Sequence, residues 1–299
     1  RVVTATPGHD AVFAGEDIVD GLPVSRLAAH LPFELPVHPR TVHEVGRVLD
    51  RDRPDVVHVH AGVVSPFAWG AVRAATRRGL PTLVTVHSIW GPLARPAFAG
   101  SDVLVRWTRW GARLSAVSDV AAERIAASVP RAGRVLVVPN GIDPSDWQVA
   151  PVDAGPGELR VVTVMRMAPR KRTMPLVRIL AAAANALPPH VRLTATLVGD
   201  GAERAGAQRW VHERGLDDAI LFAGRLDRPG ILDVFAHADV YVQPSVRESF
   251  GLAALEARTA GLPVVARVQT GTGQFVRDGI EGLLAADDGG LARALVRLG

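Results

Sequence analysis

The sequence predicts an α/β protein built from two doubly wound domains. Short apolar strands alternate with helical patterns rich in alanine, leucine and arginine, which is typical of parallel sheets covered by helices. The alternation stops at Gln148–Glu158, a stretch rich in proline, glycine and aspartate that has no periodicity. We therefore expect a first domain at 1–148, a linker at 149–158 and a second domain at 159–299, with the two sheets facing each other across a cleft.

Composition limits the class of protein. The 299 residues are 48% hydrophobic, enough for two cores of ordinary size. There is no cysteine, which excludes disulfides and thiolate metal ligands and is compatible with a cytoplasmic location. No apolar run approaches the roughly 18 residues of a membrane-spanning helix. The excess of 34 basic over 30 acidic residues is mild, and we expect no nucleic-acid partner.

The first domain is predicted from runs of β-branched residues separated by helical periodicity. One example is the helical pattern at Thr41–Arg51, which places Val45, Val48 and Leu49 on one face. In order, we expect a strand at 1–5, a Gly/Asp/Pro-rich loop up to residue 30, helix 41–51, strand 54–60, helix 65–78, strand 81–87, helix 101–113, strand 114–117, helix 118–127 capped by Ser118, and strand 135–139.

The same rhythm predicts the second domain. We expect strands at 161–165, 194–198, 220–222, 240–242 and 264–265, with the intervening helices ending at Ala186, Gly215, His237 and Ala260.

The stretch Gln243–Ala257 (QPSVRESFGLAALEA) is the strongest candidate for a ligand site. It leads from a buried strand through a loop into a helix, and helix starts at strand ends favour anions. Glu248 and Glu256 lie eight residues apart, about 2.2 helical turns, so both carboxylates can serve one site. The alternative is that Glu248 is an ordinary acid at a helix start and Glu256 a solvated helix residue.

A second corner, MRMAPRKR, follows the strand at 161–165. It holds Arg166 and Lys171, the only lysine of the chain, at a position suited to phosphate oxygens. A solvated basic turn is the alternative. Gly199-Asp200-Gly201 follows the next strand and allows close approach of a ligand, although a tight turn explains it equally well. Neither a dinucleotide nor a P-loop fingerprint occurs.

Histidines and an aromatic–basic segment mark the first domain. His58, His60 and His87 lie at neighbouring strand ends, where polar residues lining a cleft are a better interpretation than a metal site, because no carboxylate with ligand spacing accompanies them. The segment Arg106–Arg113 contains two tryptophans and three arginines. We favour a packed tryptophan pair over the alternative, a peripheral contact with anionic lipid headgroups.

Taken together, these motifs resemble retaining GT-B glycosyltransferases of family GT4 (glycosyl transferases group 1). The resemblance rests on their order along nearly the whole chain: His-Val-His-Ala at 58–61, Thr-Val-His ending at His87, Ala-Val-Ser-Asp at 116–119, Val-Pro-Asn-Gly-Ile-Asp at 138–143, Arg166 with Lys171, the Gly-Asp-Gly turn, and Glu248 with Glu256. It implies two Rossmann-like domains, the first on the acceptor side and the second binding the donor.

The resemblance also implies roles for single residues. Arg166 and Lys171 would bind the donor diphosphate, Glu248 would position the transferred sugar, and His87 would line the sugar pocket. Glu256 would hold the ribose. The remaining donor-binding residues would be Ser249, Phe250, Gly251 and Leu252 beside Glu248, Gly199 in the Gly-Asp-Gly turn, and Leu226 beside the nucleotide base. No metal and no cofactor would be needed, because basic side chains and helix dipoles replace a metal.

The resemblance therefore implies a hexosyltransferase that uses a UDP- or GDP-sugar and a hydroxyl acceptor (a saccharide, a lipid-linked or a small-molecule hydroxyl). The family's first strand and Gly-rich loop would precede Arg1, and its C-terminal crossover helix would follow Gly299, so we expect a fragment lacking both. Two alternatives remain open: a non-catalytic nucleotide-sugar-binding module, and a GT-B sugar-nucleotide epimerase. The location implied is cytoplasmic, with a peripheral membrane contact as the alternative described above.

Overall fold

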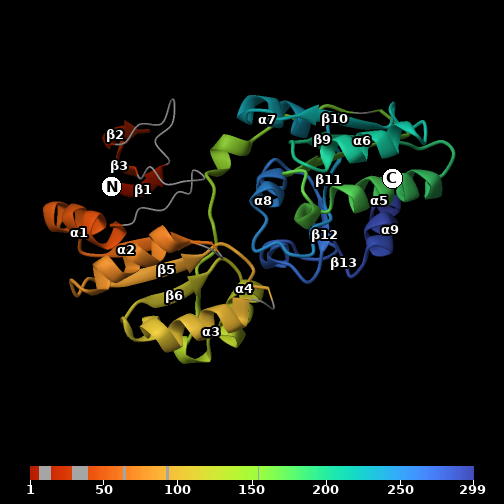
Figure 1. The fold of residues 1–299 in the computed structure, drawn as a ribbon. Coiled ribbons are helices and arrows are strands. Elements are labelled where there is room, and N and C mark those ends of the chain that lie inside the picture. The colour runs from red at the N-terminus through yellow and green to blue at the C-terminus, as the bar shows by residue number, and fades with distance from the viewer. Residues whose placement is uncertain (7–14, 29–39, 63–64, 92–93, 154) are drawn as a thin grey trace. The chain divides into compact units, whose positions relative to one another are not determined.

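The computed structural model describes residues 1–6, 15–28, 40–62, 65–91, 94–153 and 155–299, and confirms the α/β class. The described chain forms two compact units, Arg1–Val138 and Pro139–Gly299 (Figure 1).

The second unit is built on a sheet of six parallel strands in the order β10-β9-β8-β11-β12-β13. The strands are β8 (Glu158–Val164), β9 (Arg192–Val198), β10 (Ile220–Gly224), β11 (Val240–Gln243), β12 (Val264–Arg267) and β13 (Gly282–Ala285). The order reverses between β8 and its neighbour β11, because the chain builds outward on one side through β10 and then returns. This reversal is the topological switch point of the sheet.

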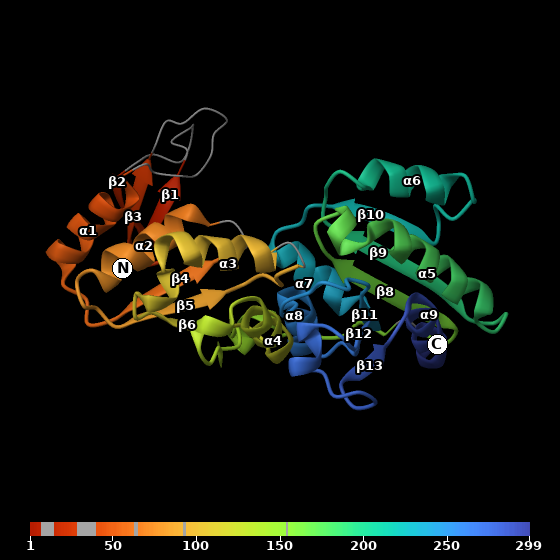
Figure 2. The same ribbon diagram turned by 60° about the horizontal axis from the view of Figure 1, so that its bottom comes forward.

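Helices cover both faces of this sheet (Figures 1 and 2). A buried cluster on one face contains residues of α5 (Thr173–Ala186), α6 (Arg204–His212) and α9 (Asp288–Leu298). A second cluster, on the other face, contains residues of α7 (Arg228–Ala236) and α8 (Leu252–Thr259). Their apolar positions recur at helical spacing, which is why each helix buries one face.

The first unit holds a sheet of four parallel strands in the order β4-β5-β6-β7, namely β4 (Val57–Ala61), β5 (Thr82–Val86), β6 (Arg113–Ala116) and β7 (Leu136–Val137). Its helices are α1 (Thr41–Asp52), α2 (Pro66–Thr76), α3 (Ala94–Val105) and α4 (Asp119–Ser128). Ser118 caps α4 as predicted, since its hydroxyl accepts the N–H of Ala121.

The prediction of one strand and a loop for residues 1–30 is wrong for the part that the structure describes. Besides β1 (Val2–Thr6), a hairpin of β2 (Gly15–Val19) and β3 (Leu22–Ala28) is present, with β3 parallel to β1. The hairpin turns at Asp20-Gly21, where both residues have positive φ (49° and 77°). Asp-Gly is a strong signal for such a two-residue turn, so the sequence contained the information. The predicted turn at 7–10 lies outside the described residues.

The predicted helix at 101–113 is also wrong in its extent. Helix α3 ends at Val105 because Arg106 adopts a left-handed conformation (φ 50°, ψ 42°). The carboxylate of Asp102 accepts the N–H and the hydroxyl of Thr108, at 2.9 and 2.8 Å, and so draws the chain back onto the helix. Trp107 is then buried with its ring 4.9 Å from that of Trp69, whereas Trp110 contacts the guanidinium of Arg73, so Trp107 packs with another partner than the predicted pair of Trp107 and Trp110.

Residues 149–158, the predicted linker, lie within the second compact unit. Trp147 just before them is buried in that unit, 6.2 Å from the ring of Phe235, and the N–H of Val152 donates to the carbonyl of Ala236. In the second unit, strand β13 and helix α9 were not predicted.

Candidate functional site

The candidate site lies where strands β8 and β11 end side by side in the second unit. Parallel strands place their carboxyl ends at one edge of the sheet, and the switch point between β8 and β11 is where open α/β sheets bind ligands. The loop after β8 carries Arg166 and Lys171, and the loop after β11 carries Glu248. The sheet order therefore brings together the two corners that the sequence singled out.

Lys171 and Glu248 form an ion pair across this switch point. Lys171 Nζ lies 2.5 Å from Glu248 Oε2, although the two residues are 77 positions apart in the sequence. Both charges are withdrawn from solvent, since the lysine side chain is 25% exposed and the glutamate side chain 11%. An ammonium group has three donors, so Lys171 keeps two for phosphate oxygens while it holds Glu248.

The three basic residues at 170–172 have different surroundings. Arg172 pairs with Asp288 of α9 (2.6 Å), so it ties two elements of the unit together. Arg170 is exposed, and no described residue pairs with its guanidinium. Arg166 is likewise exposed at the end of β8, with no hydrogen-bond or ion-pair partner for its side chain among the described residues. A solvated basic turn therefore describes Arg170, but not Lys171.

Backbone contacts with the segment after β12 fix the loop that carries Glu248. The N–H of Gly271 donates to the carbonyl of Glu248 at 2.9 Å. A Cβ on Gly271 would lie 2.0 Å from the carbonyl oxygen of Ser249, so only glycine allows these two segments to touch. Phe250 is buried against Phe275, with the ring centroids 5.1 Å apart. The loop is thus held in one conformation before any ligand arrives.

Helix α8 begins directly after this loop. Gly251 takes the left-handed conformation (φ 95°) that ends the loop, and Leu252 is the first helical residue, 44% exposed. Glu256 lies further along the helix and is half-buried. Burial raises the pKa of the Glu256 carboxyl above its usual range, and the nearby charge of Arg228 partly offsets this. The neighbourhood of Glu256 therefore favours partners that donate hydrogen bonds to it.

A row of hydrogen-bonded polar side chains supports the loop after β11, and the sequence analysis did not single it out. The hydroxyl of Tyr241, in the middle of β11, lies within hydrogen-bonding distance of the Val164 carbonyl (3.2 Å) and of Gln243 Oε1 (3.3 Å). Gln243 Nε2 in turn donates to the hydroxyl of Thr272 at 3.5 Å. Burial raises the pKa of Tyr241, so the hydroxyl stays protonated. The signal was present: Tyr241 is the only tyrosine of the chain, in an otherwise aliphatic strand.

The Gly-Asp-Gly turn after β9 packs against the loop after β8. Gly199 has φ 124°, and a Cβ there would lie 1.9 Å from the carbonyl oxygen of Met165. The N–H of Met167 donates to the carbonyl of Asp200 at 2.8 Å. Close approach of the two loops thus accounts for Gly199, while its contact with a ligand stays a prediction. Leu226 lies half-buried in the loop between β10 and α7.

Three histidines cluster around strands β4 and β5 in the first unit, with His58 and His60 in β4 and His87 directly after β5. His60 Nδ1 lies 2.7 Å from His87 Nε2, and His58 Nε2 lies 2.6 Å from the hydroxyl of Thr85. Burial, with smaller contributions from the other two histidines, lowers the pKa of His87, and burial and His60 lower that of His58. Within the described part of the chain, no group of His, Asp and Glu is arranged to hold a metal ion.

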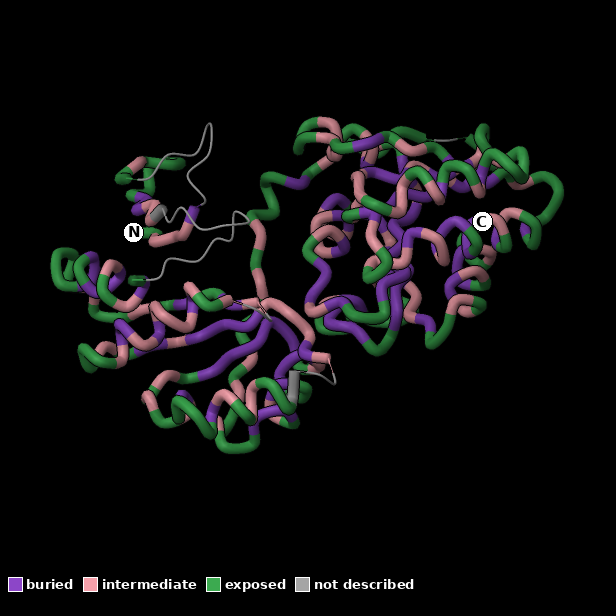
Figure 3. Tube along the Cα trace, in the orientation of Figure 1, coloured by how far each residue is buried: buried purple, intermediate pink, exposed green. Residues whose placement is uncertain are grey.

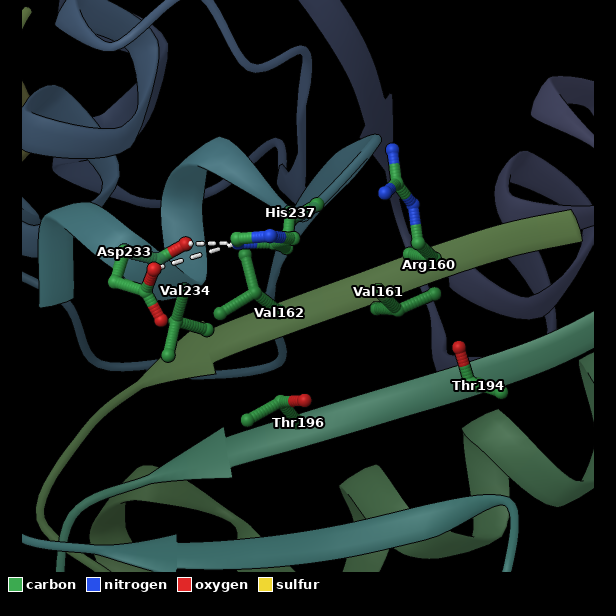
Figure 4. A pocket seen from close by; sticks show the side chains of 9 residues that line it. Arg160, Val161, Val162, Thr194, Thr196, Asp233, Val234 and His237 are labelled. Atoms are coloured by element: carbon green, nitrogen blue, oxygen red, sulfur yellow. Dashed lines mark hydrogen bonds and ion pairs between the residues drawn. The ribbon is translucent and has the colours of Figure 1, made fainter. Parts of the chain in front are cut away.

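A separate pocket of about 200 Å³ lies between α7 and the middle of strands β8 and β9 (Figure 4). It is lined by Arg160, Val161, Val162, Thr194, Thr196, Asp233, Val234, His237 and Ala238. Its charged groups are already engaged: Arg160 pairs with Asp239 at 2.8 Å, and His237 Nδ1 lies 3.6 Å from Asp233. None of the residues that line this pocket belongs to the candidate site.

Both halves of the chain match known glycosyltransferase families. Residues 1–146 match the family described as Glycosyltransferase Family 4, and residues 158–299 match the family described as Glycosyl transferases group 1.

Characterised relatives point the same way. The chain is 31% identical over 259 residues to the glycogen synthase of Mycobacterium tuberculosis, an alignment that covers 81% of this chain and 59% of that protein. It is 32% identical over 259 residues to the D-inositol 3-phosphate glycosyltransferase of Actinosynnema mirum, which covers 78% of this chain and 60% of that protein. The chain thus spans about 60% of the length of these relatives.

Among solved structures, HepE of Anabaena in complex with UDP and glucose superimposes with a TM-score of 0.71 at 23% identity, covering 93% of this chain and 76% of that chain. At this level of identity the likeness establishes the fold, which is GT-B.

Proposed function

The chain is related over both of its halves to glycosyltransferases of the GT-B fold, and on that premise we propose that it is a hexosyltransferase. It transfers a hexosyl group from a UDP- or GDP-sugar to a hydroxyl acceptor, with retention of configuration and without a metal. The observation that carries the proposal is the shielded Lys171–Glu248 pair at the switch point of the second unit, beside the unpaired guanidinium of Arg166.

The donor diphosphate binds to Arg166 and Lys171 in this proposal. Arg166 offers a planar fork of donors and Lys171 a compact charge, and both suit phosphate oxygens. As the bond from the anomeric carbon to the diphosphate oxygen breaks, negative charge develops on that oxygen. The two cations stabilise this charge more in the transition state than in the ground state, and in that respect they replace a metal ion.

The sugar and the nucleoside bind on either side of the diphosphate. Glu248 and the backbone of residues 249–252 position the transferred sugar through its hydroxyl groups, and the fixed loop limits the entropy lost on binding. Glu256 accepts hydrogen bonds from the ribose hydroxyls. Such bonds favour a carboxylate whose pKa burial has raised, since they replace the lost solvation of the charge.

The acceptor side is assigned to the first unit, where His87 lines the sugar pocket. The acceptor oxygen forms the new bond to the anomeric carbon on the face from which the diphosphate leaves, and the hydroxyl proton passes to the departing diphosphate oxygen. No protein nucleophile is assigned.

The relatives support the choice of donor. The Anabaena structure was determined with UDP and glucose, and the M. tuberculosis relative is a glycogen synthase, so a nucleotide-activated hexose is the simplest donor class. The names of the relatives point to different acceptors, from glycogen to an inositol phosphate. We therefore propose only that the acceptor is a hydroxyl compound.

The test is a turnover assay of the chain with UDP-glucose and GDP-mannose, in EDTA, with a panel of saccharide and inositol acceptors. We expect release of one nucleoside diphosphate that depends on acceptor, and a product whose anomeric proton coupling matches that of the donor sugar. A requirement for added divalent metal, or an inverted product, would contradict the proposal. Tight nucleotide binding by a chain that turns over none of these acceptors would favour the non-catalytic binding module.

A further inference from the structure

The carboxyl-terminal end of α3 projects three consecutive aliphatic side chains into solvent. Val103 is 74% exposed, Leu104 84% and Val105 54%, so no described residue covers these apolar side chains in the last turn of the helix. Figure 3 colours the chain by this exposure. Scattered single apolar residues are ordinary on protein surfaces, but a contiguous group of this kind indicates an interaction surface.

Unpaired arginines surround these aliphatic residues. Arg106, Arg109 and Arg113 follow directly in the chain and are exposed, and no described residue forms an ion pair with any of them. We call the set of residues 103–106, 109 and 113 the α3 tip.

The charge of the wider segment is strongly one-sided. Residues 56–118 contain seven arginines and a single acidic residue, Asp102, whereas the rest of the chain has 27 basic and 29 acidic residues. Asp102 is only 8% exposed and its carboxylate binds Thr108, so it does not neutralise the arginines at the surface. Arg78 of this segment pairs with Asp50 outside it, and the mild positive charge of the whole chain conceals the local surplus of positive charge that remains.

The α3 tip is held in place by the tryptophans behind it. The indole N–H of Trp110 donates to the carbonyl of Val105 at 3.1 Å, and the guanidinium of Arg73 lies over the Trp110 ring at 4.7 Å from its centroid. Trp107 is buried in the core of the unit. The exposed residues are thus presented on a fixed support and are not the end of a loose chain.

We propose that the α3 tip docks on the surface of an anionic lipid bilayer. Aliphatic side chains enter the boundary between headgroups and acyl chains, and the arginines bind the anionic headgroups around them. A nucleic acid would match the arginines but would gain nothing from Leu104. None of the helices described is long and apolar enough to cross a bilayer, so the contact is interfacial. This inference is independent of the chemistry proposed for the second unit.

The experiment is co-sedimentation of the 299-residue chain with vesicles of phosphatidylcholine, with and without about 30 mol% phosphatidylglycerol. We expect binding to the anionic vesicles that weakens as salt is raised. Val103→Ser/Leu104→Ser should weaken binding about tenfold or more, because the loss of two buried aliphatic groups costs at least that much. Arg106→Gln/Arg109→Gln should have a comparable effect and reduce the dependence on salt.

Matched variants in the second unit serve as controls. Ile280 is 69% exposed, and Arg209 and Arg297 are exposed arginines without described partners. Ile280→Ser and Arg209→Gln/Arg297→Gln should bind vesicles like the parent chain, and circular dichroism shows that each variant is folded.

Three results would overturn the proposal. The first is no binding of the folded parent chain to anionic vesicles. The second is a loss caused by the control variants that equals the loss caused by the α3-tip variants. The third is unchanged vesicle binding by Val103→Ser/Leu104→Ser together with binding to a short DNA duplex that requires the arginines, which would make the surface a general polyanion site.

Discussion

The candidate site of the second unit and the α3 tip of the first unit differ in how their charged side chains are paired. In the second unit Lys171 and Glu248 of the candidate site are paired and shielded, whereas Arg166 of the same site is exposed and has no described partner. In the first unit, three histidines meet one another and three arginines of the α3 tip face solvent without a described partner. Paired, desolvated charges are suited to a small, highly charged ligand, whereas unpaired surface charges suit a large anionic surface. This difference is the reason why we propose the nucleotide site in the second unit.

The largest effect should come from Glu248→Gln. The change keeps the shape of the side chain but removes the carboxylate that positions the sugar, so turnover should fall about 100-fold. Affinity for the nucleoside diphosphate should stay equal or become slightly tighter, since Lys171 is released from its partner. Steady-state kinetics and calorimetry give the two quantities, with Glu213→Gln, at an exposed residue directly after α6, as control. Equal losses of turnover and affinity would show that Glu248 is not a positioning residue.

Lys171→Ala should weaken nucleoside diphosphate binding about 10- to 100-fold, because a charge-assisted hydrogen bond is worth roughly 1.5–3 kcal/mol. The neighbouring Arg170→Ala should have little effect, since Arg170 has no described partner. The single Lys171 variant also leaves a buried carboxylate unpaired and should lower stability by about 1–3 kcal/mol.

The double variant Lys171→Ala/Glu248→Gln separates these effects. It should recover stability in thermal unfolding but not affinity, since no cation is restored. Recovery of affinity would mean that the single variant acted through folding alone.

Glu256→Gln should have a smaller effect, about fivefold on nucleotide affinity, because it replaces a carboxylate acceptor by an amide at one hydrogen-bonded position. Whereas the variant should weaken nucleotide binding, it should raise the free energy of unfolding of the chain. A carboxyl whose pKa is raised by burial costs folding free energy when it ionises as pH rises, so removing the charge should stabilise the chain at pH 7. A destabilised variant would indicate that a paired carboxylate, and not desolvation, sets the environment of Glu256.

The smallest effect concerns the histidines of the first unit. His58 and His87 have lowered pKa values, so the unfolded chain binds protons more readily than the folded one. Stability of this unit should therefore fall as pH drops below the ordinary histidine pKa of about 6.5. His58→Asn/His87→Asn should flatten that dependence. Tryptophan fluorescence during urea unfolding reports mainly on this unit, which contains four of the six tryptophans, and an unchanged pH dependence in the variant would contradict the assignment.

Much of this arrangement could be predicted from local patterns in the sequence. The alternation of strands and helices predicted the α/β class, and both Lys171 and Glu248 were placed at strand ends. Their pairing was not predictable in the same way, because it depends on β8 lying next to β11, which is a property of the sheet order.

Other features depend on single long-range or competing contacts. The end of α3 depends on whether Asp102 binds Thr108, and no local propensity decides that. Gly199 packs against the Met165 carbonyl of another loop, and this contact depends on the order of the strands and not on the local sequence. The hairpin at Asp20-Gly21 is different, because its turn signal was readable and the polar strands around it obscured the pattern.

The central claim is that the second unit binds a nucleoside diphosphate at Lys171 without a metal. It is tested most directly by calorimetric titration of the folded 299-residue chain with UDP and with GDP in EDTA. We expect one of the two to bind with a stoichiometry near one and Lys171→Ala to abolish most of that affinity. Binding of neither, or binding only after a divalent metal is added, would contradict the account.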